Sequence, residues 1–203
     1  MTGGLSLFDL PVEIRYHVYQ FLIPDGLRIL PVPHVDIASV TRRPPNTNLL
    51  LANKAFHDDI FDYFMIHATW KINVQYSFNF FRVDPELSGL ANWRLLPHVR
   101  KAEILVTLDL RLMQEYPSLG LEAYCVALRQ RAMVASQALS RCHDLQKLVI
   151  SFKDTTIISD WETKKTIMEP LLLHLLPGVI CVGTLSGVDS VNLRAFLTDT
   201  SLA

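Results

Sequence analysis

The second half of the chain alternates short apolar segments with longer amphipathic ones, and this order constrains the fold more than any other feature. Three apolar segments have the length and composition of strands, at residues 99–106, 145–152 and 179–183. Helical periodicity follows each of them, at about 119–141, about 161–176 and 190–198. Because strands that alternate with helices form parallel sheets with helical crossovers, we expect that architecture here.

The N-terminal part, residues 1–77, predicts a different set of elements. A helix is expected over residues 9–22, with Asp9 as its N-cap and Pro11 in the first turn, where the missing N–H costs nothing. The remaining elements follow in chain order: a strand at 27–30, an irregular Pro-rich stretch at 34–46, a helix at 48–63 capped by Thr47, and a strand at 70–76.

The strands of the second half, residues 78–203, are loosely self-similar. Lys101 and Lys147 occupy equivalent places in the first two strands, whereas the next step, from Ile150 to Val182, is shorter. Three unequal repeats are few for an independent solenoid, because each unit needs a neighbour to cover its apolar face. We therefore expect the two halves to share one core.

Composition and charge exclude several classes of protein. Hydrophobic residues make up 50% of the 203 residues, which excludes a disordered regulator and suits one domain or two small packed subdomains. The net charge of −1 gives no general attraction to phosphate or acidic lipid, so neither nucleic acid nor a membrane is an expected partner. Three widely spaced cysteines predict no disulfide framework or zinc site, and no cofactor is expected. Without a signal-peptide pattern, a cytoplasmic or nuclear location is expected.

The sequence contains none of the phosphate-binding glycine loops, zinc-protease helices or serine-hydrolase elbows that mark common enzymes. His34 and Asp36 have the spacing of two ligands in a facial iron site, although an exposed polar pair in a loop is the favoured interpretation. A third ligand would have to come from another histidine: His57, His67 or His98.

Two other polar groupings were candidates for chemistry. Asp58 and Asp62 are a like-charge pair one helical turn apart, which a divalent metal could compensate, although a solvated helix face is favoured. Cys142, His143 and Asp144 are neighbours at a helix end and point in different directions, which disfavours a catalytic triad. A small metal-dependent or His/Asp-dependent enzyme is therefore an alternative without a supporting motif.

The first helix carries an apolar stripe, since its aliphatic and aromatic side chains recur at three- and four-residue steps: Leu10, Ile14, Val18, Phe21 and Leu22. Such a stripe either packs in the protein's own core or enters the groove of a partner, as an amphipathic recognition helix does. Both interpretations stay open at this point.

The opening helix also contains the motif L-P-x-E-I-R at residues 10–15, followed by Val18-Tyr19. Residues 50–59 read L-L-A-N-K-A-F-H-D-D, and an aromatic strand at 70–76 follows. Leucine-rich segments come later, at residues 96–104 and 142–150. In these motifs the chain resembles the fungal F-box-like domain proteins, in which an F-box-type helix precedes a degenerate leucine-rich-repeat-like part.

The resemblance implies a mixed α/β fold, with a helical F-box-like subdomain and small strand pair (residues 1–77) packed on a short LRR-like strand–helix layer (residues 78–203). It implies a non-catalytic protein-interaction module, similar to a substrate receptor that docks on a Skp1-type adaptor of a ubiquitin ligase and presents a protein client. The residues implied in docking are Leu10, Pro11, Ile14, Val18 and Leu22. A structural family member that has lost adaptor docking is a further alternative.

Overall fold

A computed structural model describes residues 6–29, 38–75, 89–90, 92–109, 114, 120–154, 160–172 and 180–185, with the side chains of 27–29 and 180–185 left aside. The described helices are η1 (Leu7–Asp9), α1 (Val12–Leu22), α2 (Thr47–Leu50), α3 (Lys54–His67), η2 (Leu96–His98), α6 (Leu121–Leu139) and α7 (Trp161–Leu172). The strands are β1 (Asp25–Ile29), β2 (Ala38–Arg42), β3 (Trp70–Gln75), β4 (Lys101–Leu108), β5 (Lys147–Asp154) and β6 (Ile180–Leu185). The expected last helix, at 190–198, lies outside the described residues.

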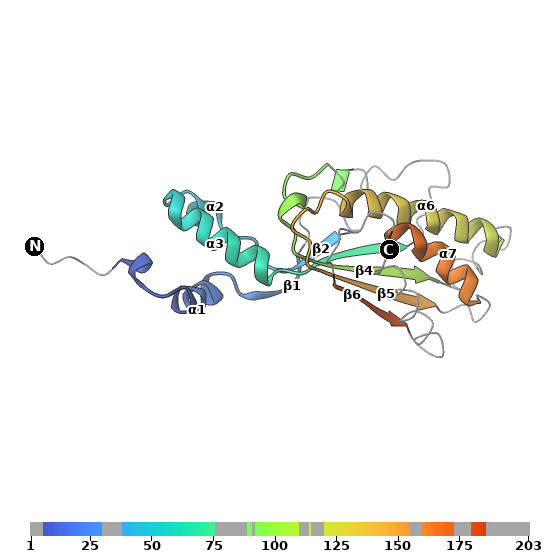
Figure 1. Cartoon of the computed structure of the whole chain (residues 1–203), viewed down its shortest axis with the longest axis horizontal. Coiled ribbons are helices and arrows are strands. Elements are labelled where there is room, and N and C mark those ends of the chain that lie inside the picture. The colour runs from blue at the N-terminus through green and yellow to red at the C-terminus, as the bar shows by residue number, and fades with distance from the viewer. Residues whose placement is uncertain are drawn as a thin grey trace, which may run out of the picture.

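The six strands form one mixed sheet whose spatial order is the chain order, β1-β2-β3-β4-β5-β6 (Figure 1). The first two pairings are antiparallel, and the three pairings from β3 to β6 are parallel. The prediction of a mixed α/β fold with parallel strands in the second half is confirmed. Helix α6 connects β4 to β5, and α7 lies between β5 and β6 in the chain.

The register of the parallel strands tests the self-similarity of the sequence. Lys101 pairs with Lys147, as the alignment of the two segments predicts. Ile150 pairs with Gly183 rather than Val182, so the last step is one residue longer than expected. A shift of one residue matters in a sheet because successive side chains point to opposite faces.

One face of the sheet is buried beneath helices. Along β4 every second side chain, including Ile104 and Val106, is fully buried, while the alternating ones such as Leu105 are half-exposed. Helices α6 and α7 pack side by side over the buried face (Figure 1). Strands β3, β4 and β5 therefore each have one buried apolar face, as in a two-layer structure, instead of the continuous burial of a sheet covered on both sides.

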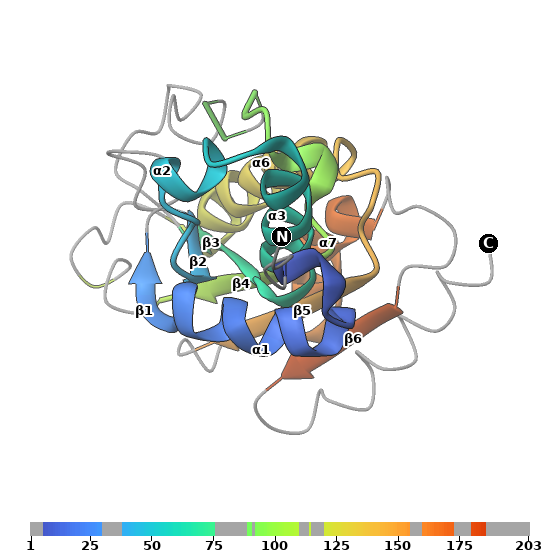
Figure 2. The same cartoon turned by 90° about the vertical axis from the view of Figure 1, so that its left-hand side faces the viewer.

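Helices α1 and α3 extend beyond the edge of the sheet at the N-terminal end of the molecule (Figure 1). Seen from that end, α1 lies across the front of the sheet with α3 above it (Figure 2). Buried residues of both chain parts belong to one hydrophobic cluster that contains Tyr19 and Phe64 as well as Ile104 and Leu148. The ladder between β3 and β4 also joins residues on either side of position 77.

Two expectations for the N-terminal part are wrong. The stretch 34–46 contains β2, whose Ala38, Ser39 and Val40 are buried and pair with β3. The single helix expected at 48–63 is two helices, capped by Asn46 and Asn53 rather than by Thr47. Asparagine side chains favour capping because their oxygen accepts a backbone N–H that the helix leaves unpaired.

The start of α1 also differs from the prediction. Asp9 does not cap α1; its side chain accepts from the backbone N–H of Ser6, which in turn caps η1 through the N–H of Phe8. Pro11 is the N-cap residue of α1 and makes no side-chain hydrogen bond there. The turn before α1 is thereby closed by its own capping box, which fixes where the helix begins.

The alternating burial of β4 predicts a sharp contrast between adjacent substitutions. Ile104→Ala should lower the free energy of unfolding by about 2–5 kcal/mol, because it leaves a cavity beneath the helices. Leu105→Ala, on the half-exposed face, should cost about 1 kcal/mol, because less apolar area is removed from contact. Urea denaturation of the two variants measures both values, and equal losses would contradict the alternating burial of β4.

Candidate docking surface

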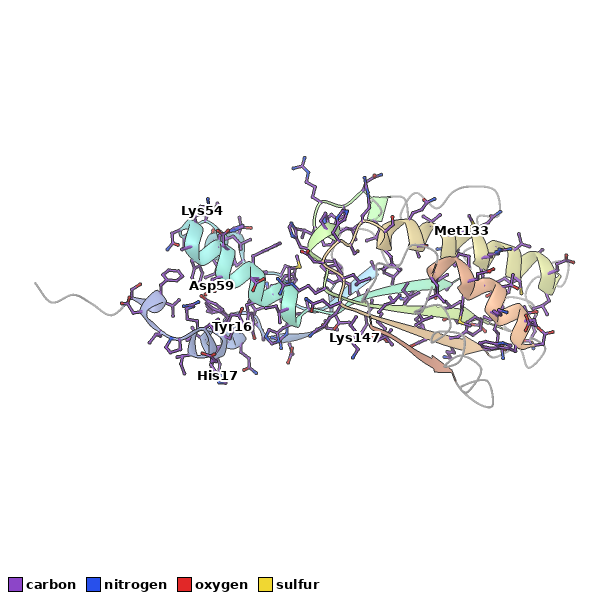
Figure 3. All side chains as sticks on the ribbon, in the orientation of Figure 1. Tyr16, His17, Lys54, Asp59, Met133 and Lys147 are labelled. Carbon is purple, nitrogen blue, oxygen red and sulfur yellow. The ribbon has the colours of Figure 1, made fainter. Side chains whose placement is uncertain are left out.

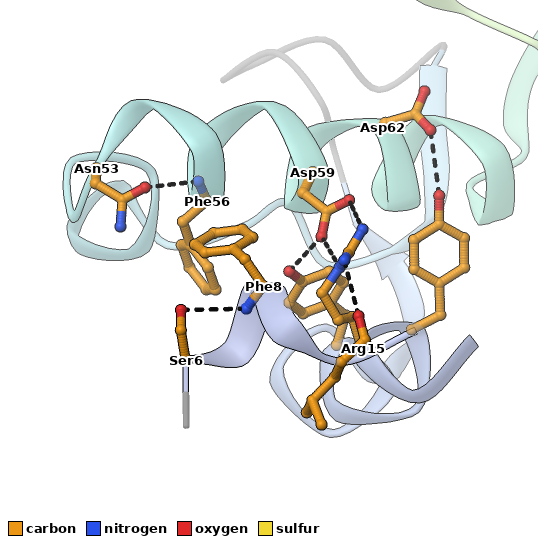
Figure 4. Close-up of polar contacts among 10 residues, drawn as sticks. Ser6, Phe8, Arg15, Asn53, Phe56, Asp59 and Asp62 are labelled. Carbon is orange, nitrogen blue, oxygen red and sulfur yellow. Dashed lines mark hydrogen bonds and ion pairs between the residues drawn. The ribbon is translucent and has the colours of Figure 1, made fainter. Parts of the chain in front are cut away.

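A carboxylate on α3 holds α1 in place. The guanidinium of Arg15 donates to Asp59 from Nε to Oδ2 at 2.8 Å and from a terminal nitrogen to Oδ1 at 3.3 Å (Figure 4). The Tyr19 hydroxyl donates to the same Oδ2 at 2.6 Å. Arg15 also donates to the carbonyl of Leu10 at 3.0 Å, which ties the turn before α1 to the same point.

A second carboxylate, one turn further along α3, extends this network. The Tyr16 hydroxyl donates to Asp62 at 3.2 Å, and a guanidinium nitrogen of Arg100 donates to the other oxygen of Asp62. Since Arg100 immediately precedes β4, this acidic turn connects α1 through α3 to the start of a central strand. The turn is thus an ion-pair network in which Asp59 is largely buried. Asp58 and Asp62 stay 62% and 43% exposed, so the solvated face predicted for that pair is confirmed, while Asp59 departs from it.

Aromatic rings fill the space between α1 and α3. Tyr19 is fully buried and lies edge-on against Tyr63 and Phe56, with ring centroids 5.7 Å from each. Tyr16 contacts Tyr63 in the same edge-to-face manner at 5.0 Å, and Tyr63 lies 4.5 Å from the ring of His67. In Figure 3, Tyr16 and Asp59 lie between the two helices, whereas His17 points away from α3. Such ring pairs stabilise a contact beyond their area of burial.

Because aromatic and charged side chains make this contact, the aliphatic side of α1 faces outward. Phe21 is 86% exposed, Ile14 47%, Leu22 43% and Val18 38%. These four side chains fall within an arc of about 100° on the helix, since successive residues turn by about 100°. Together with the exposed Pro11 that precedes them, they are called the apolar ridge below.

The five docking residues expected from the sequence therefore have unequal surroundings. Pro11, Ile14, Val18 and Leu22 lie on the apolar ridge, while Leu10 is half-buried beside η1. Phe21 was part of the apolar stripe in the sequence but not of the expected docking set, although it is the most exposed side chain of the ridge. Its place three residues after Val18 is the periodic signal that could have added it.

The contacts that orient the ridge were not anticipated. Arg15 belongs to the L-P-x-E-I-R motif, Tyr19 follows it, and Asp59 ends the segment 50–59. Asp59 lies 44 positions after Arg15 and 40 positions after Tyr19, so no local pattern reveals that these side chains meet. The signal that could have found them is the pair of adjacent acids, Asp58 and Asp59, on a helix that is otherwise largely apolar and aromatic.

The other polar groupings do not converge on a site in the described structure. Cys142 is buried, its pKa is raised to about 12 by that burial, and its thiol contacts the carbonyl of Ala138 at 3.5 Å. His143 is exposed, and Asp144 lies 3.7 Å from His98. His34 and Asp36 lie outside the described residues.

No group of three or more histidine, cysteine or acidic side chains within the described residues is arranged to hold a metal ion. Among the helices of the described ranges, none is both long enough and apolar enough to cross a membrane. Comparison of the chain with protein-family models, curated proteins and solved structures finds no match.

The two tyrosine–aspartate bonds of this interface should differ in strength. Tyr19→Phe should lower the free energy of unfolding by about 1.5–3 kcal/mol, because it removes a short, buried hydrogen bond to a carboxylate. Tyr16→Phe should cost less than about 1 kcal/mol, because its 3.2 Å bond is long for a hydroxyl donor and half-exposed. Denaturant unfolding measures both, and a larger loss for Tyr16→Phe would contradict the central role of Asp59.

The ring of His67 should make stability depend on pH. Burial lowers its pKa, Arg42 and Lys101 lower it further, and Asp25 opposes them. In the unfolded chain the ring takes up its proton near pH 6.5, so below that value the unfolded state binds more protons than the folded one. Stability should therefore fall as the pH is lowered from 7 towards 5.

His67→Phe, which keeps the ring contact with Tyr63, should flatten this part of the pH profile. Thermal unfolding at pH 5, 6, 7 and 8 measures the effect, with pH 8 as the internal reference because the wild-type ring is neutral there. A variant that loses as much stability between pH 7 and 5 as the wild type would exclude His67 as the source.

Proposed function

We propose that this chain is a non-catalytic protein-interaction module of the F-box type, which docks through the apolar ridge of α1 on a Skp1-type adaptor of a ubiquitin ligase. The single observation that carries the proposal is the ridge itself, an aliphatic and aromatic surface that the fold leaves outside its own core. Contiguous exposed apolar surface on a folded domain is typical of an interaction site.

The form of the ridge suits a helix-in-groove interaction. Its members recur at the i, i+4, i+7 and i+8 spacing with which amphipathic helices enter the grooves of their partners. Burying a fully exposed aliphatic or aromatic side chain contributes about 1.5–3 kcal/mol, so Phe21 and Ile14 are expected to be the main anchors. A structural role for these side chains would require them to be covered by the protein itself.

The contacts behind the ridge support the same proposal. Asp59 fixes α1 through Arg15 and Tyr19, so the ridge is presented by a helix that is already formed and oriented. A pre-organised helix loses less conformational entropy on binding than one that folds at the interface. The polar residues Glu13, His17 and Gln20 lie on the remaining side of α1, where they limit the apolar surface to one strip.

Co-expression of the full chain with a fungal Skp1-type adaptor, followed by size exclusion, tests the proposal. The wild type should co-elute with the adaptor, and Ile14→Asp should abolish co-elution because it places a charge among the apolar side chains of the ridge. Gln20→Asp is the matched control, since it introduces the same carboxylate on the same helix outside the ridge. It should retain co-elution.

Stability must be measured alongside binding. Both aspartate variants should unfold within about 1 kcal/mol of the wild type, because both sites are exposed and the helix dipole acts on a carboxylate in the first or last turn by about 0.3–1 kcal/mol. A wild-type chain that elutes alone, or an Ile14→Asp variant that still co-elutes, would refute docking through the ridge.

A further inference from the structure

A groove of about 550 Å³ opens between α6 and α7, far from the apolar ridge. Its apolar lining comes from both helices, with Leu121, Cys125 and Val126 on α6 and Ile167 on α7. Val126 is 53% exposed although it lies beside these apolar neighbours. Burial raises the pKa of Cys125, so its side chain contributes a neutral thiol to the lining. Thr166 donates its hydroxyl proton to the carbonyl of Glu162 and leaves its methyl group for contact.

The groove is acidic at one end. Glu122, in the first turn of α6, and Asp160 and Glu162, at the start of α7, all line it. Both helices follow parallel strands, so their N-terminal ends lie together at the carboxyl edge of the sheet (Figure 1). Each helix end adds about half a positive charge, about one in total, which three carboxylates outweigh.

The carboxylates are only partly neutralised by their neighbours. Asp160 caps α7 by accepting from the N–H of Thr163 at 2.8 Å, and Lys165 lies 3.8 Å from Glu162. The hydrogen bonds from Thr163 and the charge of Lys164 both lower the pKa of Asp160, although Lys164 itself is paired with Asp154 at 3.2 Å. Glu122 forms no ion pair with any residue in the described ranges. The one guanidinium in the lining, that of Arg129, lies about two turns after Glu122 on α6 and is 3.5 Å from Glu169. A negative potential therefore remains over the end of the groove that is formed by the first turns.

We propose that this groove binds a short peptide segment in which an apolar side chain lies next to a lysine or arginine. The apolar side chain would contact Val126 and Ile167, and the basic group would face Glu122 and Glu162. The lining of α6 from Leu121 to Arg129 is about 12 Å long at 1.5 Å per residue, which accommodates about four extended peptide residues. The acidic end disfavours nucleic acid and anionic lipid.

This assignment deepens the proposed function, since the peptide would be part of the client that the receptor presents. The binding itself does not depend on an adaptor. It can therefore be measured on the full chain alone, and a failure here leaves the adaptor experiment unaffected.

Two eight-residue peptide libraries displayed on beads test the charge preference. One is composed of leucine, valine, glycine, serine, lysine and arginine, and the other replaces the basic residues with aspartate and glutamate. Fluorescently labelled full-length protein should enrich the basic library, and the selected sequences should carry a basic residue within two positions of an apolar one. Enrichment of the acidic library, or of neither, would overturn the proposal.

Substitutions then locate the binding of the best peptide, measured by fluorescence anisotropy. Glu122→Lys should weaken it about fivefold, as expected for a rim charge pair. The matched control Asp144→Lys makes the same charge change at the opposite edge of the sheet and should leave affinity unchanged. Val126→Asn should weaken binding about tenfold, whereas Met133→Asn, on an equally exposed part of α6 outside the groove, should not.

Two results would assign the groove to another occupant or place the peptide elsewhere. A dimer in size exclusion that Val126→Asn disperses would show that a second copy of this chain covers the groove. A selected peptide whose affinity is the same for Glu122→Lys and Asp144→Lys would bind outside the groove. Either result refutes the peptide site, while co-elution with the adaptor remains a separate measurement.

Discussion

The largely buried carboxylate of Asp59 is the contact on which the arrangement of the N-terminal part depends. It accepts from both Arg15 and Tyr19, and so it decides which side of α1 turns towards the rest of the protein. A helix with a strong aliphatic stripe would ordinarily bury that stripe. Here the tyrosines and the arginine occupy the interface instead, because they can satisfy a charge on α3 that would otherwise be buried without a partner.

The sheet provides the rigid base for this arrangement. Asp62, on the same face of α3 as Asp59, binds Arg100 at the start of β4, so the helical pair is connected to a central strand as well as to its own core. The alternating burial of β4 and β5 leaves one apolar face, which α6 and α7 cover. Their own packing creates the groove at the carboxyl edge of the parallel strands, where loops and helix ends of such sheets commonly form binding sites.

The two proposed surfaces lie at opposite ends of the molecule (Figure 1). The apolar ridge belongs to the helices that extend beyond the sheet at the N-terminal end, and the groove opens near the first turns of α6 and α7. An adaptor bound at the ridge would therefore leave the groove accessible. The surfaces also differ in chemistry, since the ridge is aliphatic and aromatic whereas the groove combines an apolar lining with carboxylates. The proposed receptor function, in which an adaptor and a client are held at once, needs surfaces that are both separate and chemically different.

The sequence by itself determined most of the local elements and their order. Period-two and period-3.6 patterns predict β3, β4, β5, α6 and α7. Burial of one face makes apolar residues recur at every second position in a strand and at every third or fourth position in a helix. It also determined the parallel pairing of Lys101 with Lys147, since the strands are similar enough to align. Strand β2 and the two-helix break at Asn53 were missed, because a five-residue strand is specified by its pairing partner and a cap by one side chain.

Only the tertiary structure decided that most of the apolar stripe of α1 lies outside the protein's own core. The spacing of Ile14, Val18 and Leu22 fits a core as well as an interface, and periodicity carries no information about which neighbour will cover it. That choice depends on a contact between residues 40 or more positions apart, in which Asp59 meets Arg15 and Tyr19. The groove between α6 and α7 has the same origin, because its lining is brought together by two separate crossovers over one sheet. Local pattern fixes each helix, whereas long-range packing fixes the side that each helix leaves exposed.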